Sequence, residues 1–445
     1  MGWQDDYRSR RTTAAEAVRA VNSGERVYLG SGCAVPHALV EALTARATEL
    51  IGVEILQVLT IGPAPYTARE LADHFRCNAL FIGPNVREAV NEGRADYVPV
   101  HLHQAPELLR DGSLPLDHAF VVVSPPDEHG FCSFGIEVAV TKPAALAARR
   151  IVAEVNRHMP RTLGDSFIHV SKIDAFVEVD RALDTWRPAE PNPTEKRIGE
   201  HVAGLVEDGA CLQVGIGGIP GAVLDYLDDR RDLGVHTEMF SDGLQRLIER
   251  GVVTGERKNF HPGKVVAGFL LGSRELYDFA HDNAQIEFHP SDYVNNPFNI
   301  ARNDRMIAVN GALQVDLTGQ VCADSLGTSF YSGFGGQVDF MRGAALSRGG
   351  LAVTALPATA REGTLSRIIP VLDSGAGVVV TRADVNVVVT EFGVARLRGR
   401  NVRQRAAALI EVADPRFRDD LTRAARERGL FGRPVPGFGP GPSGA

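Results

Sequence analysis

The feature of this 445-residue sequence that most restricts its fold is an internal repeat. Each copy has the pattern of an amphipathic helix, a turn at Ser-Gly or Asp-Gly, an apolar strand, a glycine loop and a second helix. A chain that carries this pattern twice is expected to fold as two related units. The two copies are residues 14–43 and 198–227, and their glycines coincide at one constant offset, Gly24 with Gly209, Gly30 with Gly215 and Gly32 with Gly217.

The repeat continues in the same order through both halves. Continuous β-branched runs such as VVVS and GVVVT are typical of strands that are buried on both faces, as in parallel sheets covered by helices. We therefore expect two tandem open α/β domains, with a ligand site where they face each other. Three more pairs of segments match: strand, glycine and helix at 79–93 and 264–278, strand, turn and short strand at 118–135 and 305–321, and a β-rich stretch at 173–179 and 385–393.

The boundaries of these domains follow from proline and glycine. Residues 1–187 form the predicted N-terminal domain and residues 198–431 the predicted C-terminal domain. Between them, residues 188–197 contain Pro188, Pro191 and Pro193 and predict an extended linker, because each proline disfavours helix at the preceding residue. The glycine- and proline-rich tail 432–445 cannot bury apolar surface and is expected to be disordered.

Composition excludes several classes of function. A net charge of −8 disfavours a general nucleic-acid binder, which needs clustered basic residues. The five cysteines form no CxxC pair, so they suggest neither a zinc site nor a disulfide framework. The N-terminus lacks an apolar signal region, and no apolar run reaches the ~20 residues of a membrane span. We expect a soluble cytoplasmic protein that binds no membrane.

Two glycine-dense loops are candidate binding elements. Residues 215–220, GIGGIP, follow an apolar strand and open a helix, where backbone N–H groups favour an anion. Pro220 occupies the place of the third glycine in the dinucleotide fingerprint, so a tight strand-to-helix turn is an equal alternative. Residues 332–344, SGFGGQVDFMRGA, form the second loop, whose amides could bind a carbonyl oxygen, a phosphate or the amides of a cofactor.

Glu238 is the candidate nucleophile. It follows a short predicted strand, at the carboxyl edge where open α/β sheets bind ligands. A carboxylate can attack an activated acyl group to form a mixed anhydride, although most glutamates are solvated or cap helices. His236, His261 and His289 stand singly in the sequence and are expected to be surface or core side chains, with no metal bound.

Several motifs together resemble the acetyl-CoA hydrolase/transferase family, and most of all its 4-hydroxybutyrate and butyrate:acetate CoA-transferases. The resemblance spans residues 14–428, and it implies two α/β domains of the CoA-transferase type related by the repeat. The motifs that carry it include SPPDEHGFCSFG, LQVGIGGIPGAV, HTEMFSDG, HPGKVVAGFLLGS, DYVNNP and SGFGGQVDFMRGA.

The resemblance implies that CoA moves between a short-chain acyl-CoA, such as acetyl-CoA, and a carboxylate such as 4-hydroxybutyrate or butyrate. Glu238 would carry the reaction through an acyl-glutamyl anhydride and a glutamyl-CoA thioester. The family's oxyanion-binding asparagine falls at Asn295, with Asn296 as the alternative. The resemblance assigns CoA binding to two sets of residues, Gln213, Val214, Gly215, Ile216 and Gly217 in one loop and Gly333, Gly335 and Gly336 in the other.

Three further expectations accompany this assignment. CoA is a substrate rather than a permanently bound cofactor, and a homo-oligomer, in particular a dimer, is expected. Relatives carry a lysine for a CoA phosphate where this sequence offers Arg361 or Arg367. Hydrolysis of acetyl-CoA by the same Glu238 and a non-enzymatic metabolite sensor are the alternatives, the first of which depends on whether water reaches the intermediate.

Overall fold

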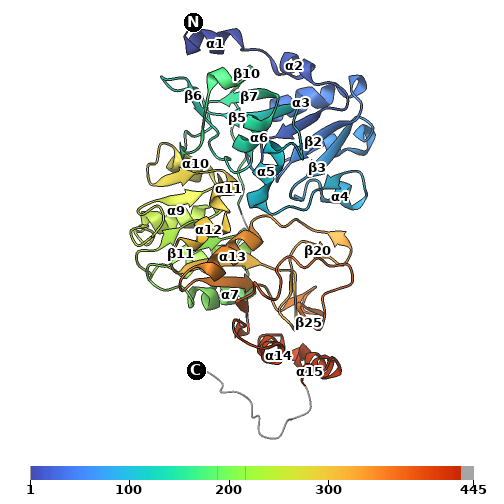
Figure 1. The fold of residues 1–445 in the computed structure, drawn as a ribbon, viewed down its shortest axis with the longest axis vertical. Coiled ribbons are helices and arrows are strands. Elements are labelled where there is room, and N and C mark those ends of the chain that lie inside the picture. The colour runs from blue at the N-terminus through green and yellow to red at the C-terminus, as the bar shows by residue number, and fades with distance from the viewer. Residues whose placement is uncertain (1, 188, 216, 432–445) are drawn as a thin grey trace.

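The computed structural model describes residues 2–431 except residues 188 and 216. Each half is built around one large sheet (Figure 1). The first has seven strands, all parallel, in the order β10-β7-β5-β1-β2-β3-β4. Its strands are β1 Arg26–Leu29, β2 Val53–Gln57, β3 Phe75–Ala79, β4 Asp96–Tyr97, β5 His118–Val123, β7 Arg150–Asn156 and β10 Ala175–Val179, with helices α1 Trp3–Ser9, α2 Ala14–Ala17, α3 His37–Ala45, α4 Arg87–Asn91, α5 Ala105–Arg110 and α6 Thr141–Ala147.

The second sheet has six strands in the order β12-β11-β17-β22-β26-β27, and only β27 is antiparallel to its neighbour. Its strands are β11 Cys211–Val214, β12 Gly234–Val235, β17 Met306–Gly311, β22 Leu351–Ala355, β26 Val387–Thr390 and β27 Gly393–Arg396. Its helices are α7 Pro193–Ala203, α8 Gly218–Asp225, α9 Asp242–Glu249, α10 Arg274–Ala280, α11 Ser291–Val294, α12 Pro297–Ala301, α13 Gln337–Leu346, α14 Val402–Glu411 and α15 Arg418–Glu427.

The two sheets confirm the α/β class and the internal repeat. Five strands occur in matching spatial order, β10-β7-β5-β1-β2 in the first half and β26-β22-β17-β11-β12 in the second. The third strand differs. In the first half β3 pairs with β2 over five residues, whereas its counterpart β14, Val265–Ala267, is joined to the end of β12 by one parallel bridge between His236 and Val266 and pairs more fully with β16, Ile286–Phe288.

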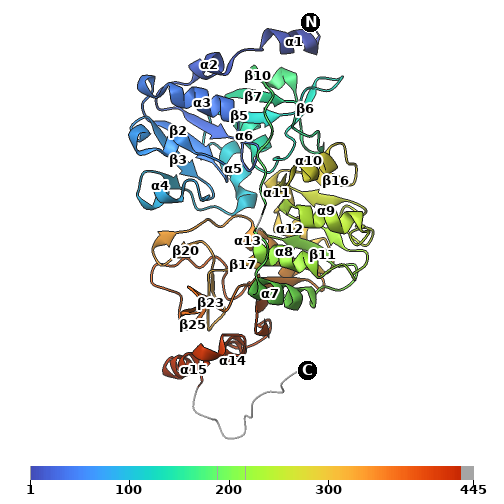
Figure 2. The same cartoon turned by 180° about the vertical axis from the view of Figure 1, so that it is seen from behind.

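Helices cover both faces of the second sheet, as the buried runs predict. Side chains alternate along a strand, so neighbouring residues of β17 enter different cores. Ile307 and Val309 belong to the core that includes α7, whereas Met306 and Ala308 belong to the core that includes α13. Figure 1 shows α13 in front of this sheet, and Figure 2, from behind, shows α7 and α8 in front of it.

The predicted linker 188–197 is wrong over its last five residues, because α7 begins at Pro193. Asn192 caps the helix: its side-chain oxygen accepts from the N–H groups of Thr194 at 2.9 Å and Glu195 at 3.1 Å. Proline suits the first helical position, since its fixed φ fits and its missing N–H has no partner to lose there. The predicted tail 432–445 lies outside the described residues.

A second difference concerns the strand predicted at the start of residues 79–93. The strand β3 ends at Ala79, so Leu80 and Phe81 already belong to the loop at the carboxyl edge of the sheet. The ring of Phe81 reaches the second glycine loop, where a Cβ added at Gly335 would lie 3.2 Å from it. The first half thereby contributes an aromatic side chain to the interface between the halves.

The halves share one continuous buried core. Strand β8, Leu163–Gly164, belongs to the first half but pairs with β16 of the second. Next to it, the N–H groups of Val138 and Ala139 donate to the carbonyl of Gly268, at 3.2 and 3.1 Å. The boundary between the halves is therefore packed and hydrogen-bonded, and any site on it is held rigidly. Within the described residues, every helix is too short or too polar to span a bilayer.

Candidate active site

Glu238 lies at the boundary between the halves, between β12 and the short strand β13, Met239–Phe240. Its backbone carbonyl accepts from the N–H groups of Gly268 at 2.9 Å and Phe269 at 3.1 Å. Phe269 begins β15, Phe269–Leu270, which pairs with β13. These bonds hold the Glu238 backbone at the carboxyl edge of β12, and its side chain faces the boundary.

Two donors from the second half hold the Glu238 carboxylate. The Nδ2 atom of Asn295 donates to Oε2 of Glu238 at 2.6 Å, and the backbone N–H of Gly336 also donates to this carboxylate. Asn295 is fully buried at the end of α11. Asn296 instead caps α12, because its Oδ1 accepts from the N–H of Phe298 at 3.0 Å. Of the two asparagines left open by the sequence, the structure brings Asn295 to Glu238.

The surroundings of Glu238 change its acidity. Burial raises the pKa of Glu238 to about 7, and the negative charge of Asp339 on α13 also raises it. Hydrogen bonds donated by Asn295 and by the backbone amide of Gly336 lower it in part. Asp339 is itself buried, and it accepts from His103 of the first half, whose Nδ1 lies 2.7 Å from Oδ1. Near neutral pH, Glu238 therefore exists in both forms, and the ionised form is a weakly solvated carboxylate.

Gly336 explains why the second loop is dense in glycine. A Cβ added there would lie 1.8 Å from Oε2 of Glu238 and 2.2 Å from Nδ2 of Asn295. Its φ of −94° is open to any residue. The requirement is therefore close approach of the backbone to the carboxylate, not a left-handed conformation.

Two hollows meet at Glu238. The inner one is a small cavity of about 60 Å³ between the halves, lined by Ser31, Gly32, Val58, Leu59, Phe81, Leu102, Glu137, Ala139, Val140, Glu238, Phe269 and Gly335. The outer one is a wider groove of about 340 Å³ along the second half, and Glu238 also lines it. A molecule in the groove can therefore reach the carboxylate and place a small group in the inner cavity.

The predicted binding residues are distributed unevenly around this groove. Gln213, Val214 and Gly215 line it from the end of β11, and Gly333, Gly335 and Gly336 line it from the second loop. The side chain of Gln213 is buried and accepts from Asn310 Nδ2 at 3.0 Å, so it also joins two strands. Gly217 caps α8 with φ 130° and does not line the groove. Ile216 lies outside the described residues.

The two arginines proposed for a phosphate differ in position. Arg367 is near the groove, because its Nη1 donates to the carbonyl of Ala312 at 3.4 Å and Ala312 lines the groove. Arg361 lies in the turn that follows β23, Thr359–Ala360, with a positive φ of 48°, and does not line the groove. Of the two arginines, the structure therefore places Arg367 beside the groove and Arg361 away from it.

Sequence reasoning missed two residues of the first half. Phe81 lines both the cavity and the groove, and Glu137 lines the cavity opposite the second half. Glu137 had a readable signal, since a lone carboxylate inside the apolar run FGIEVAV is buried, and buried carboxylates are rare without a partner. Phe81 had none, because its role depends on how the two halves pack.

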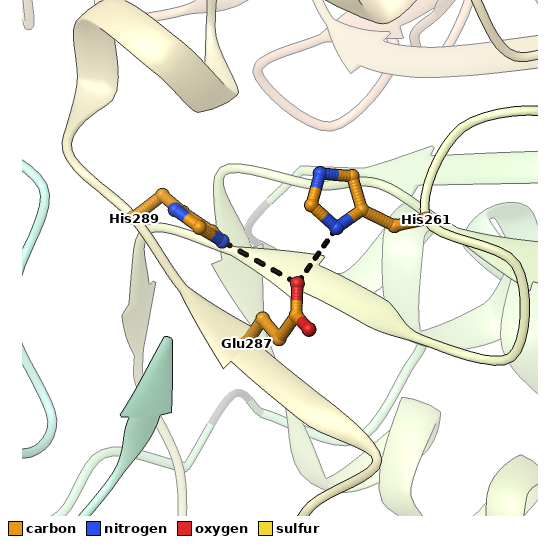
Figure 3. Close-up of side chains that lie close together, drawn as sticks. All are labelled: His261, Glu287 and His289. Atoms are coloured by element: carbon orange, nitrogen blue, oxygen red, sulfur yellow. Dashed lines mark ion pairs between the residues drawn. The ribbon is translucent and has the colours of Figure 1, made fainter. Parts of the chain in front are cut away.

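A separate cluster contains the side-chain types that hold metals (Figure 3). The Nδ1 atom of His261 and the Nε2 atom of His289 lie 2.7 and 3.5 Å from Oε2 of Glu287 on β16, and the second nitrogen of His261 lies 2.7 Å from the hydroxyl of Tyr293. His261 and His289 are thus not isolated in the fold, contrary to their reading from sequence. His236 is a core residue, with Nε2 2.8 Å from the carbonyl of Val294.

Comparison with known proteins finds similarity to one family over nearly the whole chain. Residues 1–184 match the model of the acetyl-CoA hydrolase/transferase N-terminal domain, and residues 272–425 match that of its C-terminal domain. The 4-hydroxybutyrate coenzyme A transferase of Clostridium kluyveri is 48% identical, over 96% of this chain and 100% of the relative. The butyryl-CoA:acetate CoA-transferase of Anaerostipes caccae is 36% identical, over 97% and 99%.

A solved structure agrees with these relatives. The crystal structure of 4-hydroxybutyrate CoA-transferase from Porphyromonas gingivalis superposes with a TM-score of 0.84 at 42% identity. The match covers 96% of this chain and 100% of that one. The similarity therefore extends through both halves and across the boundary between them.

Proposed function

The chain belongs to the acetyl-CoA hydrolase/transferase family, as its motifs predicted, and on this premise we propose which CoA transfer it performs. It moves CoA between a short-chain acyl-CoA, such as acetyl-CoA, and a carboxylate such as 4-hydroxybutyrate or butyrate. The observation that supports this most is the position of Glu238 where a small, mostly apolar cavity meets a wider groove. The pantetheine arm of CoA fits the groove, and the acyl group fits the cavity.

Glu238 is the proposed covalent nucleophile. Asn295 holds Oε2, which leaves Oε1 as the attacking atom. The Oε1–carbon bond forms as the carbon–sulfur bond of the thioester breaks, and CoA thiolate leaves behind an acyl-glutamyl anhydride. The thiolate then attacks the glutamyl carbonyl and releases the free acid, which gives a glutamyl-CoA thioester. An incoming carboxylate reverses both steps and leaves as the new acyl-CoA.

Asn295 and Gly336 support the steps at the glutamyl carbonyl. The Nδ2 atom of Asn295 contacts Oε2, which becomes the carbonyl oxygen of the anhydride and of the thioester. When thiolate or carboxylate attacks that carbonyl, Oε2 carries the negative charge of the tetrahedral intermediate. Donors already in place for this charge are worth about 3–4 kcal/mol each in the transition state.

The inner cavity favours transfer over hydrolysis. Its walls are mostly apolar, and an acyl group held there occupies the space beside the anhydride, which disfavours a water molecule. Hydrolysis by the same Glu238 uses the same first step, so the two activities differ in the fate of the intermediate. The sensor alternative is set aside because the family is one of enzymes.

Trapping of the intermediate tests this proposal. The protein is incubated with acetyl-CoA, treated with borohydride and mapped by mass spectrometry; a glutamyl-CoA thioester is reduced at Glu238. An unmodified Glu238 peptide after full CoA turnover would contradict the mechanism. Acetate, free CoA and the new acyl-CoA, measured with and without 4-hydroxybutyrate or butyrate, then separate the activities: a hydrolase releases acetate and free CoA without either acid, whereas a transferase releases acetate when an acceptor is present and its CoA appears as the new acyl-CoA.

Several expectations from the sequence stay predictions. They are the domain bounds 1–187 and 198–431, a homodimer, and a location in the cytoplasm. CoA and the carboxylate act as substrates in this scheme, and the proposed chemistry needs no permanently bound cofactor.

A further inference from the structure

Glu137 is a second carboxyl group in the inner cavity, and the mechanism above does not use it. It belongs to the first half, in the segment before α6, and is 4% exposed. Its Oε1 accepts from the N–H of Val140 at 3.4 Å, a long contact. Its Oε2 is buried and has no hydrogen-bond partner among the described residues. Leaving a buried carboxyl oxygen unpaired is destabilising, so the chain alone does not satisfy the hydrogen-bonding capacity of this carboxyl group.

The carboxyl of Glu137 is mostly protonated at neutral pH. Burial raises the pKa of Glu137 to about 8, and donation from the backbone N–H groups of Val140 and Thr141 offsets only part of this rise. A protonated carboxyl both donates and accepts a hydrogen bond. It therefore matches a hydroxyl group, which does the same, and it does not repel an acyl group joined to the Glu238 carboxylate.

The backbone places Glu137 and Glu238 on opposite sides of one short segment. Glu137 forms an isolated antiparallel bridge with Phe269, and the N–H of Phe269 donates to the carbonyl of Glu238. The two carboxyl groups share no hydrogen bond among the described side chains, although both line the same cavity. An acyl group bound to Glu238 and extending into this cavity therefore passes beside Glu137.

The other residues around the cavity offer few hydrogen-bond partners to a polar group. Val58, Leu59, Val140 and Phe269 are apolar, and the hydroxyl of Ser31 is already within 3.2 Å of the Tyr28 hydroxyl. The cavity volume of about 60 Å³ is several times the ~10–15 Å³ that one water needs, which suits a chain of a few atoms.

We propose that the inner cavity selects a short acyl group that carries a hydroxyl, and that the carboxyl group of Glu137 binds this hydroxyl. Glu137 is in this view a specificity-determining residue of the first half, whereas the covalent chemistry belongs to the second. The inference rests on the proposed CoA transfer and adds the class of acyl group: hydroxyacyl chains in preference to plain alkyl chains of the same length.

The test compares three acceptors of the same carbon count, butyrate, 3-hydroxybutyrate and 4-hydroxybutyrate, with acetyl-CoA as donor. Wild-type protein is expected to give a kcat/KM for one of the hydroxy acids about 10- to 100-fold above that for butyrate. Glu137→Gln, which stays neutral and keeps hydrogen-bonding atoms, should retain most of this preference. Glu137→Met, which is apolar and similar in size, should lose it while still accepting butyrate.

The controls distinguish a wrong assignment of Glu137 from a wrong proposed function and from a variant that does not fold. Glu107→Gln, at an exposed position on α5, should leave the preference unchanged, and thermal unfolding checks that each variant is folded. A wild-type protein that labels Glu238 and transfers CoA to butyrate at least as well as to both hydroxy acids overturns this inference alone. So does a Glu137→Met variant that keeps the preference. Failure to label Glu238 in the wild type would instead overturn the proposed function.

Discussion

The two glutamates of the inner cavity come from different halves and differ in their donors. Glu137 is buried and Glu238 is half-buried, and both have raised pKa values, about 7 for Glu238 and about 8 for Glu137. The carboxylate of Glu238 receives a short bond from the Asn295 side chain, whereas Oε2 of Glu137 receives none from the described residues. The difference is one of position: Asn295 fixes one oxygen of Glu238 and leaves the other to attack, whereas Glu137 has one oxygen without a partner among the described residues and is assigned here to recognition of a hydroxyl.

The largest effect is expected from removal of the attacking atom. Glu238→Ala should lower transfer by about 10⁴-fold or more and abolish borohydride labelling, because no other described side chain replaces the nucleophile. Glu238→Asp should retain a trace of activity, roughly 10²-fold or more below the wild type, since a carboxylate set back by one methylene attacks poorly. Steady-state transfer assays measure both, with Glu107→Gln as control. A Glu238→Ala variant that transfers CoA at the wild-type rate would show that another residue is the nucleophile.

The second-largest effect is expected from a substitution at Gly336, whose backbone lies against the Glu238 carboxylate. Gly336→Ala places a methyl group where Oε2 of Glu238 and Nδ2 of Asn295 lie, so both side chains must move. We expect a loss of about 10³-fold in kcat with the protein still folded. Gly221→Ala on α8 is the matched control, because a Cβ there meets nothing within 4 Å. Equal activity of the two variants would show that the loop can shift to accommodate the added methyl group without loss of kcat.

Loss of a single donor should have a smaller effect. Asn295→Ala should lower kcat about 10²- to 10³-fold, and it should move the acidic limb of the rate profile to higher pH, because the removed donor lowers the pKa of Glu238. Asn296→Ala removes a helix cap and should cost about 1 kcal/mol of stability with little change in kcat. Measurement of kcat as a function of pH for both variants tests this prediction. The reverse pattern would make Asn296 the functional residue.

The smallest expected effect concerns stability and pH. A carboxyl whose pKa is raised on folding stabilises the fold most when it is protonated, below its unfolded value of 4.5. This contribution from Glu137 is lost as the pH rises toward its folded pKa of about 8. Wild type should therefore lose stability relative to Glu137→Gln between pH 5 and 8, by a few kcal/mol at most. Thermal unfolding at several pH values measures the difference, and parallel curves would contradict it.

Local sequence was enough to predict the elements, and in one place more could have been read from it. The strands and helices around the glycine loops occur where the repeat predicts them, because apolar periodicity and glycine turns act over a few residues. The start of α7 was also readable, since Asn192 followed by Pro193 and Glu195 is a capping box. The proline count alone was misleading, because the first position of a helix accepts proline.

The sequence by itself determined the two α/β halves, the family, and Glu238 as the candidate nucleophile, since each rests on residues close together in the chain. Only the tertiary structure decided which asparagine meets Glu238, why Gly336 must be glycine, and that Glu137 shares the cavity. It also gathered His261, Glu287 and His289 into one cluster. The contacts of Glu238 with Asn295 and Gly336 join segments 57 to 98 residues apart and form when the second half folds, and Glu137 reaches the cavity only when the two halves pack together, so no local pattern encodes them.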